Sequence, residues 1–235
     1  MSDTMVATSG RVKTARSTSR VAAVSLVAAA TLFGAAWFFM PVAGVTDAEE
    51  IFRIVTPQRG LVLTASILQL VAATLYVPAM IAIIRSTDLT FHSKLWRPAS
   101  VLIVGTLGLA TDAIDHLLSY AMTAPGVDQS AQVAVMEWMQ GPALLLISPL
   151  IASFFVGAVW LSVAFARAGA ISRWNPGLYV VALGIAVVGA ALATATDLIE
   201  TRTVGVLTLG TVAVAQAWLG VVLWTQPRAA ATAVN

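Results

Sequence analysis

Long apolar runs, separated by short polar stretches, fill most of this chain between residues 21 and 226. A helix needs about 20 apolar residues to cross the hydrocarbon core of a bilayer. Six runs approach or exceed this length, and they predict transmembrane helices at about 21–42, 60–84, 98–122, 142–166, 176–199 and 204–225. The pattern therefore predicts an all-α membrane protein, with one six-helix domain over 21–226 and almost no soluble part.

Two short polar segments lie outside this domain. Residues 1–20, rich in Ser, Thr and Arg, predict a disordered basic cytoplasmic tail, and residues 227–235 predict a second cytoplasmic tail. A basic segment followed by an apolar one also occurs in signal peptides, whose apolar core spans roughly 7–15 residues. Because the run over 21–42 is longer, we expect it to remain as a signal-anchor helix.

The positive charges predict the orientation of the helices. Ten of the 13 Lys and Arg residues lie in four segments on one side of the predicted membrane, namely 1–20, 85–97, 167–175 and 227–235. Cytoplasmic segments carry an excess of such residues. We therefore expect a multi-pass plasma-membrane protein with both termini in the cytoplasm, and with Trp37 and Trp138 as interface anchors on the outer side.

Composition narrows the candidate chemistry. Apolar residues make up 59% of the chain and charged residues 10%, which is far from the usage of soluble domains. The chain has no cysteine, so disulfides, thiolate chemistry and Cys-ligated metal sites are excluded. The net charge of +2 is spread over short loops, and no folded basic face is predicted that would bind nucleic acid.

A six-residue phrase occurs twice inside the apolar runs. Ala110–Asp115 reads Ala-Thr-Asp-Ala-Ile-Asp, and Ala195–Glu200 reads Ala-Thr-Asp-Leu-Ile-Glu. A Trp-x-Pro sequence, at Trp96 and at Trp174, opens each of the two predicted helices. With fainter similarities elsewhere, this internal repeat predicts three tandem helical hairpins. The alternative is chance recurrence, because small and apolar residues are common in membrane helices.

The first copy of the phrase begins a polar stripe. Four residues have the i, i+3, i+4, i+7 spacing of one helical face, with Tyr120 beside them: Asp112, Asp115, His116 and Ser119. Asp112 lies about 21 Å along its predicted helix, in the outer half of the membrane. Ionisable residues inside a membrane cost roughly 2.5–3.5 kcal/mol on insertion scales and favour a functional role.

The second copy places acids at the outer end of the helix predicted over 176–199. If this helix packs against the helix over 98–122, acids from both copies share one region with His116. We predict five catalytic candidates, Asp112, Asp115, His116, Asp197 and Glu200, and four ligand-binding candidates, Ser119, Tyr120, Glu137 and Arg202. The alternative for Asp197 and Glu200 is that water simply solvates them at the interface.

Such a group of carboxylates cannot stay fully ionised away from water, so it holds protons or a cation. Asp112, Asp115 and His116 are also suitable ligands for a divalent metal, which leaves the cofactor open. Haem, flavin and nicotinamide are not indicated. His92, in the loop on the opposite side from His116, is predicted to be a solvated histidine.

Three functions fit this pattern. We favour binding or transformation of a small hydrophobic, lipid- or isoprenoid-like molecule by acid/base chemistry, which in an enzyme would be an isomerase- or cyclase-type reaction. A cation- or proton-coupled carrier is the second, although the inner halves of the helices carry few polar residues. The third is an accessory membrane protein without a site of its own, which leaves a protein partner or homo-oligomer open.

Short motifs around the predicted fourth helix resemble a known family. Glu137-Trp138-x-x-Gly141-Pro142, Arg167-Ala168-Gly169 and Arg173-Trp174 resemble a family of uncharacterised bacterial six-helix integral membrane proteins, a domain of unknown function. The resemblance covers most of the second to fifth predicted helices. It implies a bacterial membrane protein but no activity, and the stripe that begins at Asp112 is not part of it.

Overall fold

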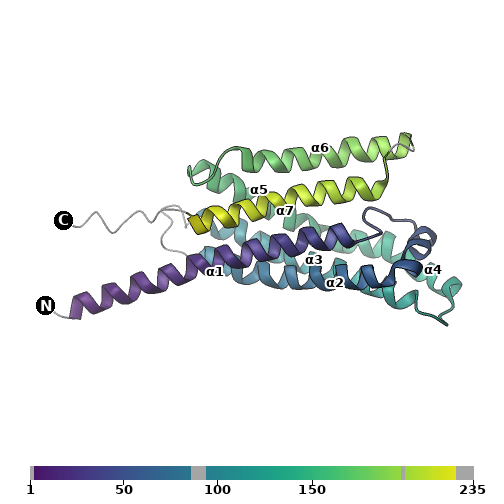
Figure 1. Ribbon diagram of the computed structural model, residues 1–235, viewed down its shortest axis with the longest axis horizontal. Helices are drawn as coiled ribbons and strands as arrows, with labels where there is room; N and C mark the ends of the chain where they lie inside the picture. The colour runs from purple at the N-terminus through teal and green to yellow at the C-terminus, as the bar shows by residue number, and fades with distance from the viewer. Residues whose placement is uncertain (1–2, 86–93, 197–198, 226–235) are drawn as a thin grey trace.

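The described part of the chain is built from helices that run along one common axis (Figure 1). The computed structural model describes residues 3–85, 94–196 and 199–225, and these contain no β-strand. In chain order the helical elements are α1 (Asp3–Phe39), α2 (Ala48–Arg85), α3 (Trp96–Met122), α4 (Gln129–Trp138), the π-helical turn η2 (Met139–Ala143), α5 (Leu144–Arg167), α6 (Trp174–Ala195) and α7 (Thr201–Thr225).

Six helical segments are long and apolar enough to cross a membrane, judged by length and composition within the described residues. They are Arg20–Phe39, Ala48–Arg85, Trp96–Met122, Ser130–Arg167, Trp174–Ala195 and Thr201–Thr225. The prediction of an all-α protein with six apolar spans is confirmed. The apolar runs fixed these spans because each contains the roughly 20 residues that a bilayer core requires.

The first two helices begin well before their apolar runs. The backbone of α1 is helical from Asp3, where a disordered tail over 1–20 was predicted, because a helix propagates readily from an already formed span when no proline intervenes. In α2 the Asp47 side chain accepts a hydrogen bond from the Glu50 amide at 2.8 Å and starts the helix before residue 60. Pro57 then interrupts α2, and Gln58 has non-helical φ and ψ of −120° and 22°.

The fourth span differs most from its prediction. Pro142 was expected in the first turn of a helix over 142–166, but the helical stretch begins at α4 and Pro142 lies inside η2. Proline has no amide hydrogen to donate and crowds the preceding turn, and a wider π-helical turn accommodates both effects.

α6 ends sooner than the predicted helix over 176–199. Thr196 is extended, with φ of −148° and ψ of 151°, so the second copy of the repeated phrase leaves the helix after Ala195. Threonine and aspartate side chains bond nearby backbone groups and favour helix ends and turns. The acid of this copy that the structure describes, Glu200, therefore lies in a connection.

The helices pack in the order α5, α3, α2, α1, α7, α6, each against its neighbours in this series (Figure 1). The Arg20 guanidinium lies 5.6 Å from the centre of the Trp224 ring, so α1 enters and α7 leaves the bundle at one end. We call this the terminal end, and the opposite end, where α1 joins α2, the distal end. α6 lies at the edge of the bundle with most of its surface exposed.

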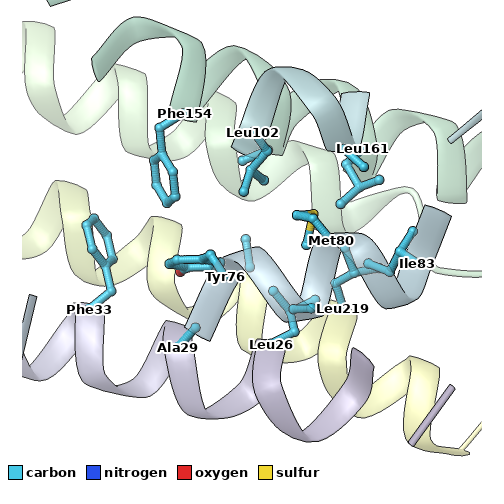
Figure 2. Close-up of a cluster of buried hydrophobic side chains, with 14 of the residues drawn as sticks. Leu26, Ala29, Phe33, Tyr76, Met80, Ile83, Leu102, Phe154, Leu161 and Leu219 are labelled. Atoms are coloured by element: carbon cyan, nitrogen blue, oxygen red, sulfur yellow. The ribbon is translucent and has the colours of Figure 1, made fainter. Parts of the chain in front are cut away.

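The buried side chains form two apolar clusters. The larger one fills the centre of the bundle with residues such as Leu26, Phe33, Met80, Phe154 and Leu219 (Figure 2). The smaller one fills the distal end and includes α2 residues up to Ala65. Ser66 and Gln69, both fully buried polar residues of α2, lie between the two clusters.

Glycines bring α3 and α5 into close contact. A Cβ on Gly105 would lie 2.2 Å from the Phe154 backbone, and one on Gly157 would lie 2.5 Å from the Leu102 amide nitrogen. Small residues at helix crossings are typical of membrane proteins, where backbones approach closely. This contact fixes the position of α3, which carries most of the candidate site.

Candidate functional site

Asp112 of α3 contacts the buried amide of Gln69 on α2. Gln69 Nε2 donates to Asp112 Oδ2 at 2.6 Å and to the Leu109 carbonyl oxygen at 3.3 Å. Gln69 is completely buried, and the Asp112 side chain is 19% exposed. The carboxylate is therefore held in a fixed orientation at the boundary between the two apolar clusters.

His116 lies one helical turn beyond Asp112 and faces the same region. The distance from His116 Nδ1 to Asp112 Oδ2 is 4.0 Å, and the imidazole side chain is 11% exposed. This distance is too long for a direct hydrogen bond. Nδ1 is buried and has no hydrogen-bond partner.

Trp37 of α1 completes this group. Its ring packs edge-on against the His116 imidazole, with 5.9 Å between ring centres, and its buried Nε1 has no hydrogen-bond partner. The sequence predicts that Trp37 is an interface anchor. Its ring is half-buried and also contacts His116, so Trp37 is part of the candidate site as well. We call Trp37, Gln69, Asp112 and His116 the Asp112 cluster.

Asp115 points toward a different element. Its Oδ2 accepts a hydrogen bond from Gln140 Nε2 at 2.9 Å, and Gln140 belongs to η2. The predicted stripe on α3 therefore divides, with Asp112 and His116 directed toward α1 and α2 and Asp115 toward η2. Within the described residues no group of three or more His, Cys, Asp or Glu side chains is arranged to hold a metal.

Ser119 and Tyr120 contribute through the end of α3. Ser119 is buried, and its hydroxyl donates to the His116 carbonyl oxygen at 2.7 Å. The Tyr120 carbonyl oxygen accepts from Arg59 Nη2 at 3.1 Å, and the Arg59 guanidinium lies 4.3 Å from the centre of the Tyr120 ring. These contacts fasten α3 to α2 just after the interruption at Gln58.

The candidates in and just after the second copy occupy other surroundings. Arg202 donates to the carbonyl oxygens of Phe38 at 2.9 Å and Met40 at 3.2 Å, where a cation suits the C-terminus of α1. Glu200 is exposed just before α7. α3 and α6 share no packed interface in the described residues, so the packing expected to join both copies is absent. Asp197 and His92 lie outside the described residues.

Two surface pockets flank the bundle without including the Asp112 cluster. One, of about 400 Å³ at the distal end, is lined by Thr46, Asp47, Ala48, Glu49, Glu137, Gln140 and Gly141. Glu137 is exposed there, and Gln140 connects this pocket to Asp115. The other pocket, of about 360 Å³ between α6 and α7, is lined by apolar residues and glycines.

A second group of buried polar side chains was not predicted from the sequence. The Tyr76 hydroxyl donates to Gln216 Oε1, with Tyr179 beside the same amide. Asn175 Nδ2 donates to the Ala215 carbonyl oxygen at 2.8 Å, and the Ser162 hydroxyl donates to Asn175 Oδ1. We call Tyr76, Ser162, Asn175, Tyr179 and Gln216 the tyrosine–amide network. It lies in the terminal half, where few polar groups were expected.

The partners of Asp112 and Asp115 were missed as well. Gln69, Gln140 and Gln216 are glutamines within long apolar segments, and an isolated amide in such a segment is itself a signal of a buried polar contact. Comparison with known proteins gives no match to a family model, a curated protein or a solved structure.

Proposed function

We propose that this chain is a multi-pass membrane protein whose Asp112 and His116 form an acid/base site for a small hydrophobic, lipid- or isoprenoid-like molecule. The supporting observation is the pair itself, a carboxylate oriented by Gln69 and an imidazole nitrogen without a partner at 4.0 Å. A carboxylate and an imidazole at this separation can act on one group placed between them, one giving and one taking a proton.

The apolar character of the molecule follows from the surroundings of the pair. Asp112 and His116 are mostly buried and keep a small exposed fraction within a span that is apolar enough to cross a membrane. The hydrocarbon core of a bilayer surrounds such a span. An apolar molecule dissolves in this surrounding and reaches the neighbourhood of the pair, whereas an ionic solute is excluded from it.

The composition of the purified protein tests this function. Apolar molecules extracted from the wild-type protein are compared by mass spectrometry with those from Asp112→Asn and His116→Gln variants. We expect one compound, stoichiometric with the wild-type protein, to be lost from both variants. Asp115→Asn is the matched control, because Asp115 lies on the same helix but binds Gln140, and it should retain the compound. Identical extracts from all four proteins would refute the proposal and favour an accessory role.

A proton-coupled carrier is the second candidate, and the tyrosine–amide network favours it. This network extends buried polar groups from Asn175 at the start of α6 to Tyr76 and Gln216 farther inside the bundle. A carrier predicts pH changes inside protein-containing vesicles that disappear in both Asp112→Asn and Gln216→Leu. A signal lost only with Asp112, or no signal, would eliminate this candidate.

The proposed orientation has both termini in the cytoplasm of a bacterial cell, with three tandem hairpins in the plasma membrane. The packing of α1 on α2, α3 on α5 and α6 on α7 supports the hairpins. Because the chain has no cysteine, single cysteines report the side unambiguously. A membrane-impermeant thiol reagent should label Ser130→Cys in intact cells and Ala168→Cys only after permeabilisation. The reverse result would invert the orientation.

A further inference from the structure

We infer that the Asp112 cluster binds a hydroxyl group, carried by an apolar alcohol or by water. The inference rests on the proposed function and names the chemistry that this site recognises. Five buried side-chain nitrogen and oxygen atoms of the described residues lack a hydrogen-bond partner. Three of them belong to this cluster: Trp37 Nε1, Gln69 Oε1 and His116 Nδ1.

Unpaired buried polar atoms are rare in folded proteins, and several together indicate a group that binds them. The four residues are linked by contacts from three helices, through Gln69 to Asp112, Asp112 to His116, and His116 to Trp37. The unpaired atoms are therefore a property of one place in the bundle rather than scattered irregularities.

The chemistry of the three atoms defines the bound group. An indole Nε1 only donates, an amide oxygen only accepts, and an imidazole nitrogen does either. A group that satisfies Trp37 and Gln69 must both accept and donate. A carboxylate or phosphate offers no donor for the Gln69 oxygen, and an ammonium offers no acceptor for the Trp37 nitrogen. A hydroxyl group offers both.

The distance between Asp112 and His116 agrees with this assignment. At 4.0 Å the two side chains are too far apart for a direct hydrogen bond, and a single oxygen can contact both. Apolar side chains surround the cluster, including Phe33 next to Trp37 and the distal apolar cluster that packs against it. A hydroxyl on an otherwise apolar molecule matches this environment.

The two histidines of the chain allow a direct measurement. In a His92→Gln background, His116 gives the single histidine side-chain signal in nitrogen NMR of the protein in lipid nanodiscs. The probes are dodecanol and dodecane, which differ in the hydroxyl group. We expect dodecanol to shift the Nδ1 signal of His116 and dodecane to leave it unchanged.

Variants identify the contacts. Gln69→Leu and Trp37→Phe should each weaken the dodecanol response about tenfold, as expected for loss of one buried hydrogen bond. Gln140→Leu and Trp138→Phe are matched controls outside the cluster and should respond like the parent protein. If His116 ignores both probes but its signal changes in Gln69→Leu, the bound hydroxyl is that of water. Trp37→Phe removes a ring that packs on His116, so this variant is used only to compare the size of the dodecanol response.

Two results would overturn the inference. Equal responses to dodecane and dodecanol would show that the site does not recognise a hydroxyl group. An apolar site at Asp112 would remain, so the proposed function would stand. A His116 signal unaffected by either probe and by Gln69→Leu would mean that the imidazole is merely packed against Trp37 and binds no hydroxyl group. The proposed function fails separately, when the extract of Asp112→Asn equals that of the wild-type protein.

Discussion

The Asp112 cluster and the tyrosine–amide network both bring polar side chains from several helices into an apolar interior, yet they differ in what they leave unpaired. The network is built from hydroxyl and amide groups, and its described contacts include three side-chain hydrogen bonds. The cluster contains ionisable groups and three unpaired atoms, whereas the network leaves one atom unpaired, Gln216 Nε2. Neutral, bonded networks hold membrane helices together, whereas ionisable groups with unused bonding capacity indicate a site.

Aromatic rings separate the two regions. Tyr76 of the network contacts Phe154 with 5.1 Å between ring centres, and Phe154 contacts Phe33 at 5.5 Å (Figure 2). Phe33 then contacts Trp37 at 6.5 Å, and Trp37 contacts His116. These contacting rings form an apolar layer between the two regions.

The largest effect is expected when this layer is displaced. In Gly105→Ala the new Cβ would lie 2.2 Å from the backbone of Phe154, which forces α3 and α5 apart. We expect a loss of about 3 kcal/mol in the free energy of unfolding, measured by thermal denaturation in detergent, because overpacking against backbone has no flexible side chain to relieve it. Gly184→Ala on α6 is the control, since no atom lies within 4 Å of its added Cβ. Equal stability of the two variants would contradict the close packing.

A smaller loss is expected within the network. Tyr76→Phe leaves the buried Gln216 oxygen without its donor, which should cost about 0.5–2 kcal/mol, in the range measured for hydrogen bonds between membrane helices. The double variant with Gln216→Leu removes both groups and should recover part of the stability. A double variant that is less stable than the sum of its single changes would mean that the network does more than join helices.

The opposite sign is expected in the Asp112 cluster. Asp112→Asn replaces an ionisable group that is mostly buried with a neutral one of the same shape, so stability should stay equal or rise by about 1 kcal/mol while the bound compound is lost. Stability and ligand content are measured on the same preparations. A destabilised Asp112→Asn that keeps its ligand would place the cluster with the network as a structural element.

The smallest effect is expected at a solvated acid, which serves as a baseline for pH experiments. Hydrogen bonds from the Ser130 hydroxyl and amide hold the pKa of Asp128 below its ordinary value at the start of α4. Its contribution to stability is therefore present above the ordinary pKa and is lost as pH falls through the lowered one. Asp128→Ala should be slightly less stable than wild type at neutral pH, with the difference shrinking as pH falls below the ordinary aspartate pKa of about 3.9. A difference that grows on acidification would contradict this account.

The sequence predicts the six apolar spans, and it predicts that Asp112 and His116, two of the four residues of the Asp112 cluster, lie together. Apolar runs report directly on membrane helices, and the i, i+4 spacing of Asp112 and His116 places both on one face. Gln69 and Trp37 could not be assigned to this site, because their contact with α3 depends on how α1, α2 and α3 pack. The end of α6 at Thr196 was missed because an apolar run conceals a local preference for turns.

The π-helical turn at Met139–Ala143 has a consequence for how this chain tolerates changes in length. A π turn holds one more residue than an α turn, and each α-helical residue advances the helix by about 100°. Deleting one residue there would restore a regular helix and rotate α4 relative to α5 by that angle, carrying Gln140 away from Asp115. A single-residue deletion would thus rotate α4 relative to the rest of the bundle. A sequence alignment that ignores the extra residue of the π turn would assign the wrong residues to the face toward Asp115.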